Sequence, residues 1–364
     1  MFSDSPFQEI ARSSGAVFRD YGGLGIAESY GDPATEYRAA RAAAGLFDLS
    51  FRGILRFTGA DRTTFLHNLL SNDIEALRPG EGCYATLLTQ QSKVVADANV
   101  LCLEDSLWLD LDVRFEERAR AHLEKYLVAD EVEIESRIAL DTSLGVYGPR
   151  SGEVLRAALG SVSLPEAEHG HMAAVLDGVS LRVSRIPWSV DPGFALIVSR
   201  GEAAAVWKAL AAGGAPLGLR PAGMAALDAM RIEAGIAAPG IDFDESHLVL
   251  EAALERGISF KKGCYLGQEV VERASARGHV NRRRVGLRIE STDVPASSAK
   301  ILASGAEVGI ITSAAFSPTL GAAVAMGYVK RDWMEPGKRV EVETAKGPLA
   351  AEVVRLPLPN RPAK

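Results

Sequence analysis

The sequence predicts an α+β protein of more than one domain that ends in a small all-β domain. Its 364 residues, 47% of them hydrophobic, exceed one compact domain of typical size, so two or three domains are expected. Helical spacing and strand-like alternation are interleaved up to about residue 282. From residue 283, short strand-like runs follow one another with Gly, Ser and Pro between them, which indicates a small β-barrel or sandwich.

The N-terminal third is predicted to alternate between helices and strands. Strong helix formers at 36–45 favour a helix that Gly45 ends. Strand-like alternation follows over 45–59, and Asp61 is placed to cap a helix over 63–73. The next elements are expected to be strands at 83–89, 94–103 and 107–112 and a helix at 115–127.

The middle of the chain continues this mixture until an irregular segment interrupts it. Strands are predicted at 132–137, 143–148 and 180–186, and helices at 151–160, 201–214 and 221–235. Residues 236–282 are irregular and rich in charge and Gly, yet they retain apolar residues such as Phe243 and Leu250, which favours a functional connecting segment. The C-terminal strands are expected at 283–290, 300–304, 307–316, 322–329, 339–344 and 349–356.

Charge and cysteine usage exclude several classes of protein. A net charge of −7 argues against a general nucleic-acid or anionic-membrane partner. Cys83, Cys102 and Cys264 form neither a disulfide framework nor a zinc-ligand spacing, so we expect a reducing compartment and no metal site. The N-terminus lacks an apolar signal region, and no apolar run approaches the roughly 20 residues of a membrane span. A cytoplasmic location is therefore expected.

The strongest local signal is the segment Lys262–Glu269, with Cys264 as the candidate reactive residue. Lys261 and Lys262 supply positive charge that favours a thiolate. The glycines permit tight turns, and the polar residues that follow them could hold a ligand or a second chain. The alternative is an inert buried cysteine in a Gly-rich loop. The candidate motif residues around Cys264 are Lys262, Gly263, Tyr265, Gly267, Gln268 and Glu269.

Basic residues downstream of Cys264 form a second candidate site. Arg273, Arg277, His279 and the run 282–284 could bind a carboxylate or phosphate, or they could form a solvated surface. The acidic residues at 242–245 could pair with these arginines, and they lack a calcium-loop pattern.

Four further residues are ambiguous by themselves. Asp97 lies in an apolar strand-like run, where a carboxylate either faces water at a strand edge or sits in a pocket with a shifted pKa. Tyr84 and Trp188 are residue types that usually belong to the core, and Arg231 could pair with Glu233 or Asp228.

The residues Lys262–Glu269, KGCYLGQE, are similar to the K-G-C-[FY]-x-G-Q-E signature of the YgfZ-type family. The flanking segments 230–236, 243–252 and 277–287 also resemble that family. Four other segments, at 39–50, 65–73, 147–155 and 316–321, resemble the wider glycine-cleavage T-protein superfamily. This resemblance implies a three-domain cloverleaf with a central hole that binds a reduced folate and a C-terminal small β-barrel. The implied domains are 1–55 with 140–235, 56–139 with 236–282, and 283–364.

The resemblance also implies a folate site. It places Asp97 by the folate, and it matches family positions with Tyr84, Trp188 and Arg231. The sequence departs from the T-protein pattern at Ala195, where a pterin-binding glutamate is expected, and at Leu227, where an arginine is expected.

Three functions follow from these residues. The resemblance to the YgfZ-type family implies a folate-binding accessory protein that supports assembly or repair of iron–sulfur clusters in client proteins through Cys264. The alternative is a tetrahydrofolate-dependent aminomethyltransferase or other one-carbon transferase, with Asp97 at the reacting folate nitrogen. A folate-independent scaffold is the third. The first is the leading prediction, with tetrahydrofolate or a derivative as the cofactor.

Overall fold

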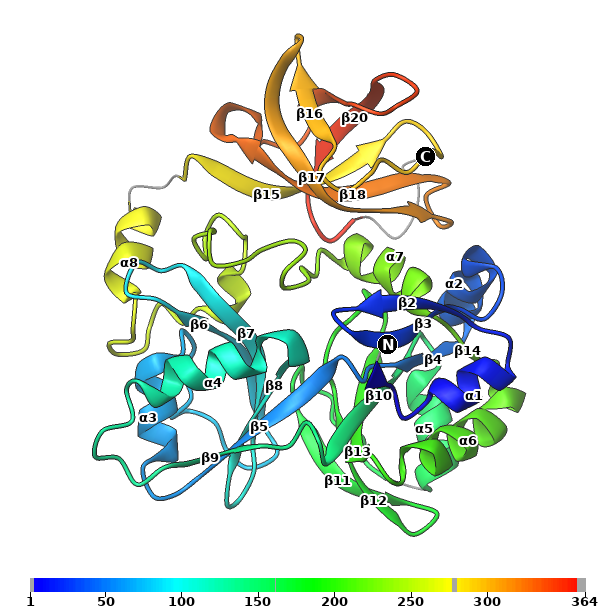
Figure 1. Ribbon diagram of the computed structural model, residues 1–364, viewed down its shortest axis with the longest axis vertical. Helices are drawn as coiled ribbons and strands as arrows, with labels where there is room; N and C mark the ends of the chain where they lie inside the picture. The colour runs from blue at the N-terminus through cyan, green and yellow to red at the C-terminus, as the bar shows by residue number, and fades with distance from the viewer. Residues whose placement is uncertain (1–2, 161, 277–279, 359–364) are drawn as a thin grey trace.

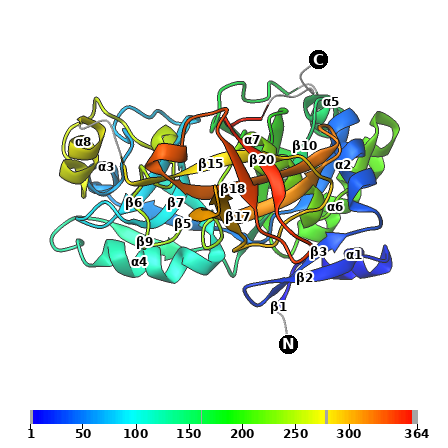
Figure 2. The same cartoon turned by 90° about the horizontal axis from the view of Figure 1, so that it is seen from above.

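The computed structural model describes residues 3–160, 162–276 and 280–358, which form three lobes around a common centre (Figure 1). The C-terminal barrel is one lobe, and two sheet-containing lobes lie side by side below it. The chain after α7 crosses between the barrel and the sheet of β6 and β7, so a single connecting segment contacts two lobes. Viewed from above, α3 and α8 lie at one end of the molecule and α5 and α6 at the other (Figure 2).

The first lobe is built on a six-stranded sheet with the order β11-β12-β13-β10-β4-β14. All five residues of β4 are buried, as expected for a strand covered on both faces. The strands are β4 (Ala44–Asp48), β10 (Asp141–Tyr147), β11 (His171–Leu176), β12 (Val179–Ser184), β13 (Gly193–Ser199) and β14 (Leu219–Pro221). The helices are α1 (Gln8–Ser13), α2 (Pro33–Ala42), α5 (Ser151–Leu159), α6 (Ala203–Gly214) and α7 (Met224–Ala234). A three-stranded sheet adds β1 (Ser3–Asp4), β2 (Val17–Tyr21) and β3 (Leu24–Ser29).

The second lobe is built on a five-stranded sheet with the order β6-β7-β8-β5-β9. Its core packs leucines and valines of these strands against helices α3 and α4. The strands are β5 (Arg52–Thr58), β6 (Gly82–Leu88), β7 (Val94–Cys102), β8 (Leu107–Asp112) and β9 (Glu133–Ser136). The helices are α3 (Arg62–Leu69), α4 (Glu116–Glu124) and α8 (Gln268–Ala276).

The third lobe is a closed barrel, as the run of short C-terminal strands predicts. Its strands close in the order β15-β18-β17-β16-β19-β20, so the barrel has no free edge. The strands are β15 (Arg282–Ile289), β16 (Lys300–Ala303), β17 (Ala306–Ser317), β18 (Ala322–Lys330), β19 (Arg339–Val342) and β20 (Leu349–Val354). The predicted three-lobed α+β fold with a C-terminal barrel is therefore confirmed, whereas the domain bounds stay a prediction.

Two local predictions are wrong. Gly45 does not end a helix, because α2 ends at Ala42 and Gly45 lies inside β4. A Cβ at this position would approach the Phe47 ring to 2.5 Å, so the glycine allows close packing within the sheet. The segment 236–282 is also not irregular throughout, because residues 268–276 form helix α8. No helix in the described part of the chain is long and apolar enough to cross a membrane.

Candidate functional site

Tyr84 and Asp97 meet on adjacent antiparallel strands. Tyr84 lies on β6 opposite Asn99 of β7, and Asp97 lies two residues from Asn99, so both side chains project from the same face of the sheet. The Tyr84 hydroxyl donates to Asp97 Oδ2 over 2.9 Å. Both residues are buried. Of the two environments that the sequence left open for Asp97, the structure selects the buried one.

The Asp97 carboxyl has a raised pKa. Burial is the main cause, since removing a carboxylate from water penalises its charged form. The Arg52 guanidinium and the hydrogen bond from Tyr84 act in the opposite direction without cancelling the effect of burial. A buried carboxyl with a raised pKa can hold a proton closer to neutral pH than an exposed one.

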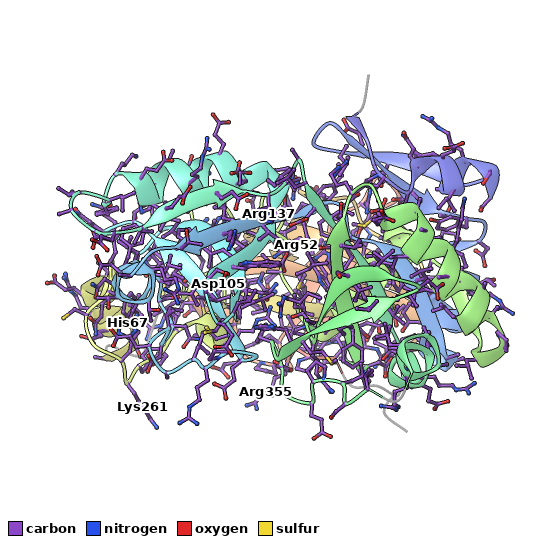
Figure 3. All side chains as sticks on the ribbon, turned by 90° about the horizontal axis from the view of Figure 1, so that it is seen from below. Arg52, His67, Asp105, Arg137, Lys261 and Arg355 are labelled. Carbon is purple, nitrogen blue, oxygen red and sulfur yellow. The ribbon has the colours of Figure 1, made fainter. Side chains whose placement is uncertain are left out.

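A buried ion pair lies beside Asp97. Arg52 on β5 contacts Asp110 on β8 with Nε 3.1 Å from Oδ1, and both side chains are at most 5% exposed. Asn99 donates to Asp110 Oδ2 over 2.7 Å, which completes the partners of that carboxylate. Figure 3 shows Arg52 near the middle of the molecule, where the two sheet lobes meet. This pair fixes the positive charge that acts on Asp97.

Trp188 joins the same neighbourhood from the first lobe. Its ring packs edge-on against Phe51 with centroids 5.4 Å apart, and the Arg52 guanidinium lies 5.9 Å from the Trp188 ring. Ala195 and Leu227, the two departures from the T-protein pattern, are buried in the same apolar cluster as Trp188. The surroundings of Trp188 are therefore aromatic and aliphatic.

Arg231 occupies a different network. Its guanidinium contacts Asp228 over 2.7 Å and Asp242 over 2.8 Å, and it also donates to Ser313 on β17. Among the described residues it forms no hydrogen bond with Tyr84, Asp97 or Trp188. Arg231 thus connects α7, the connecting segment and the barrel, and its predicted contact with folate stays a prediction.

The Lys262–Glu269 segment anchors the connecting segment to the second lobe. The Lys262 ammonium is buried and donates to the carbonyl oxygens of His67, Leu70 and Asn72 at the C-terminal end of α3. Desolvation lowers the pKa of Lys262 to about 8. The charge expected to activate Cys264 is therefore bound to a helix end, where a cation is favoured.

The other motif residues also make local contacts. Tyr265 is buried in an apolar cluster with Leu88 and Val94, and Gln268 donates to Glu272 one turn along α8. Cys264, Gly263 and Glu269 are exposed. Figure 3 shows the neighbouring Lys261 pointing outward from the molecule. The cysteine is exposed, so the alternative of a buried core cysteine is wrong.

Gly267 is required by the backbone of this segment. Its φ is +89°, and a Cβ there would lie 2.6 Å from the carbonyl oxygen of Thr89. We expect Gly267→Ala to lower the free energy of unfolding by about 2 kcal/mol or more. Gly263→Ala is the matched control, since a Cβ at Gly263 meets no atom within 4 Å. Urea midpoints of both variants test this, and equal midpoints would contradict the assigned role of Gly267.

The downstream basic residues do not form one site. Arg282 pairs with Glu251 and Arg283 with Glu255, whereas Arg284 is buried against backbone carbonyls. Arg273 is exposed on α8, and the predicted Arg277 and His279 lie outside the described residues. In the described part of the chain, no group of three His, Cys, Asp or Glu side chains could hold a metal ion.

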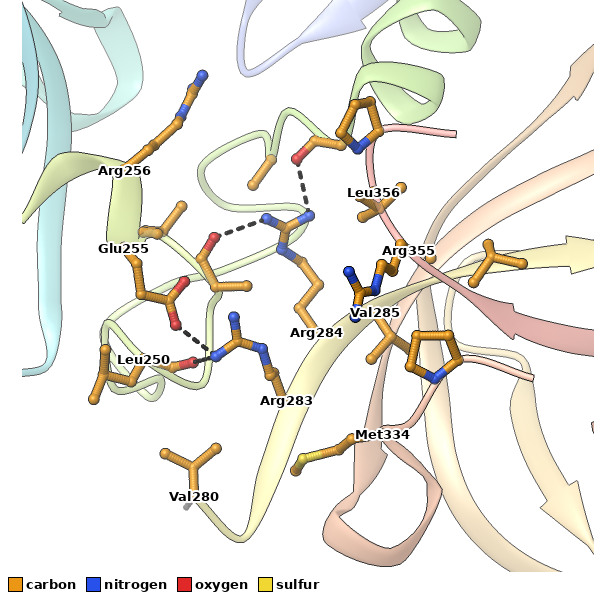
Figure 4. Close-up of a pocket in the computed structure, with 18 of the residues that line it drawn as sticks. Leu250, Glu255, Arg256, Val280, Arg283, Arg284, Val285, Met334, Arg355 and Leu356 are labelled. Carbon is orange, nitrogen blue, oxygen red and sulfur yellow. Dashed lines mark hydrogen bonds and ion pairs between the residues drawn. The ribbon is translucent and has the colours of Figure 1, made fainter. Parts of the chain in front are cut away.

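A cavity of about 940 Å³ lies between the connecting segment and the barrel (Figure 4), and neither Tyr84 nor Asp97 lines it. Arg256 lines this cavity, and its guanidinium lies 4.3 Å from the centroid of the Tyr84 ring. Sequence reasoning missed Arg256, Arg52 and Asp110. The alternation in LWLDLD could have indicated a second buried acid, but Arg256 carried no local signal.

Two protein-family models match the chain. Residues 7–262 match the GCVT N-terminal domain, and residues 282–358 match the glycine cleavage T-protein C-terminal barrel domain. Aminomethyltransferases from Saccharopolyspora erythraea and Desulforamulus reducens are 33% and 30% identical in sequence to this chain. These alignments cover 99% and 98% of this chain and 98% of each relative. The crystal structure of glycine cleavage system aminomethyltransferase T from Bartonella henselae superposes with a TM-score of 0.90. It is 25% identical, and the match covers 100% of this chain and 99% of that one.

These comparisons correct the leading functional prediction. An iron–sulfur accessory role through Cys264 is contradicted by full-length relatives at about 30% identity that are named aminomethyltransferase and by the structural match. The structure gives a physical reason, because the Lys262 ammonium is bound to carbonyl oxygens of α3. The prediction of iron–sulfur client proteins depended on that role, and the described residues do not test it.

Proposed function

Because the chain belongs to the glycine-cleavage T-protein family, we propose that it is a tetrahydrofolate-dependent one-carbon transferase of the aminomethyltransferase kind. The observation that carries this proposal is the buried Tyr84–Asp97 pair, whose tyrosine ring contacts Arg256, a residue that lines a cavity of about 940 Å³. A carboxyl with a raised pKa in such a place is suited to proton transfer during catalysis.

The residues around the pair fit a reduced folate. The cavity that Arg256 lines has the volume of a typical small-molecule site, and the Arg256 guanidinium lies over the Tyr84 ring. Asp97 offers an acceptor for ring N–H groups, and Trp188 packs edge-on against Phe51 close to Arg52, whose charge acts on Asp97. Ala195 and Leu227 supply no polar group, so on this side the ring is held by apolar contact.

In this proposal the bound tetrahydrofolate supplies the nitrogen that accepts the one-carbon unit. Asp97 holds or moves the proton at that nitrogen, and burial raises the pKa of its carboxyl. The Tyr84 hydroxyl positions the carboxyl by donating to Oδ2. Arg52 is a positioning residue, since its charge, fixed by Asp110, favours the ionised state of Asp97.

Calorimetric titration with tetrahydrofolate, followed by a transfer assay with an aminomethyl donor, tests the proposal. We expect saturable binding and formation of methylenetetrahydrofolate. Cys264→Ala should leave both unchanged, because Cys264 is exposed and takes no part in the Tyr84–Asp97 pair. Absence of tetrahydrofolate binding in the unchanged protein would overturn the proposal.

Within the family, we propose that the Lys262–Glu269 segment marks a YgfZ-type subgroup. Its eight residues support this assignment by their resemblance to the signature of that subgroup. The assignment states the subgroup with which the chain shares ancestry and the segment that anchors α8. It adds no second activity to the proposed one.

A further inference from the structure

Arg256 belongs to the short helical turn η3 (Glu255–Gly257), which packs against strand β6. A Cβ at Gly257 would lie 2.9 Å from the Tyr84 ring, so the glycine allows the backbone of the turn to approach that ring. The Gly257 carbonyl oxygen accepts a hydrogen bond of 2.6 Å from Ser71 of the second lobe. The turn that carries Arg256 is therefore fixed against the strand that carries Tyr84.

The Arg256 side chain reaches over the Tyr84 ring without an ion pair of its own. Its guanidinium carbon lies 4.3 Å from the ring centroid, close enough for an attractive cation–π contact. Arg256 is exposed, and it points away from Arg284 and Arg355 (Figure 4). Within residues 3–160, 162–276 and 280–358, no carboxylate forms an ion pair with it. Its charge is therefore not neutralised by any acidic side chain of these ranges.

The other charges that act on the buried Asp97 carboxyl are already paired. The ionisable groups that act on this carboxyl are Arg52, Tyr84, Asp112 and Arg256. Arg52 is paired with Asp110, and Asp112 lies 2.7 Å from Arg114, so each of these charges is largely offset by its partner. Among the groups that act on Asp97, the uncompensated charge is thus the cation over the tyrosine ring.

This cation favours the ionised form of Asp97 by two routes of the same sign. Burial is the largest influence on the pKa of both Asp97 and Tyr84 and raises it, whereas Arg256 lowers both pKa values. Arg256 thus stabilises the carboxylate directly, and it makes the Tyr84 hydroxyl a better donor in the hydrogen bond of 2.9 Å that holds this carboxylate.

We propose that Arg256 is a second positioning residue for one-carbon transfer, which holds the Tyr84 ring and shifts Asp97 toward its ionised form. This role rests on the proposed function, because it concerns the carboxyl that holds or moves the proton. It differs from the role of Arg52, since Arg52 is buried in an ion pair and Arg256 can be replaced at the surface of the cavity without leaving a buried charge unpaired.

A thermal double-mutant cycle tests the coupling between Arg256 and Asp97 without requiring any activity. Loss of Arg256 raises the folded-state pKa of Asp97 further above its unfolded value. The added cost in stability is absent below the unfolded pKa, grows as the pH rises and is complete above the folded pKa. We therefore expect Arg256→Gln to lower Tm more at pH 8 than at pH 5, and this difference to vanish in the Asp97→Asn background.

The other groups near Arg256 do not imitate this result. The guanidinium also acts on His169 and Arg284. Burial, with a smaller contribution from Arg256, lowers the pKa of His169 to about 4, so this histidine stays neutral between pH 5 and pH 8. Arginine keeps its charge over the same range. The cycle therefore reports on Asp97.

The pH profile of one-carbon transfer gives a second readout. The ionisation of Asp97 should move to higher pH by about 0.5 or more in Arg256→Gln. Arg256→Lys should restore most of the original profile, since an ammonium also binds an aromatic face. Arg288→Gln is the matched control and should leave the profile unchanged, because Arg288 is an exposed arginine of the barrel that does not line this cavity.

The outcomes separate this role from the proposed function. An unmoved pH profile in Arg256→Gln, or an equal effect of Arg256→Gln on Tm with and without Asp97→Asn, overturns the role of Arg256 even if transfer occurs. A coupled Tm cycle in a protein that neither binds tetrahydrofolate nor transfers the one-carbon unit would instead keep the electrostatic action of Arg256 on Asp97 and remove the proposed reaction.

Discussion

Asp97→Asn is expected to abolish one-carbon transfer while leaving the protein at least as thermally stable as before. The amide cannot hold or move the proton, and loss of a general acid or base costs about 10²- to 10⁴-fold in rate. Its oxygen can still accept from Tyr84, so the local hydrogen bond can be kept. Transfer rate and Tm measured on the same preparations check both halves of this expectation.

The gain in stability should depend on pH in a defined direction. The folded-state pKa of Asp97 is raised above its unfolded value, so the ionised carboxylate costs stability. That cost is absent below the unfolded pKa of about 3.9, grows as the pH rises and is complete above the folded pKa. A tenfold difference in proton affinity between the folded and unfolded states corresponds to about 1.4 kcal/mol of stability.

The difference in Tm between Asp97→Asn and the unchanged protein should therefore be larger at pH 8 than at pH 5. Tyr84→Phe is the matched control, because it removes the hydrogen bond and keeps the carboxylate. If Asp97→Asn transfers the one-carbon unit at the normal rate, Asp97 is excluded from catalysis. If Asp97→Asn has a lower Tm than the unchanged protein at pH 8, the charge of Asp97 stabilises the fold.

Asp110→Ala is expected to be the most destabilising single substitution near the site. It leaves the Arg52 guanidinium buried without its carboxylate, and breaking such a pair costs about 3–5 kcal/mol. It also leaves the Asn99 amide without its acceptor. Urea midpoints and Tm should both fall sharply, and tetrahydrofolate binding should weaken because Arg52 loses the carboxylate that holds it beside Trp188 and Asp97.

The double variant Arg52→Met, Asp110→Leu distinguishes charge burial from packing. Replacing both members of a buried pair with apolar residues is often neutral, so we expect it to recover most of the lost stability. It should not recover transfer, because the charge beside Asp97 is gone. If Asp110→Ala unfolds at the same urea concentration as the unchanged protein, the pair does not hold the two strands together.

The sequence alone identified the elements that local pattern specifies. The alternation of 94–103 and 107–112 indicated β7 and β8, and the six short C-terminal runs each became a barrel strand. It also pointed to Asp97, since a carboxylate within an apolar strand is unusual enough to notice. It missed α8, whose helical pattern lies inside a segment rich in charge and Gly.

Tertiary structure decided which of those residues act together. Lys262 precedes Cys264 by two residues, yet its ammonium binds carbonyl oxygens about 190 positions earlier in the chain, a choice that composition cannot reveal. Likewise, Arg52, Asp97 and Asp110 come together because β5, β8 and β7 are neighbours in one sheet, and Trp188 reaches them from another lobe. Sequence determines the periodicity of apolar residues and the local propensity for helix or strand. The pKa of Asp97 and the partners of each charged side chain depend instead on burial and on contacts between residues far apart in the chain.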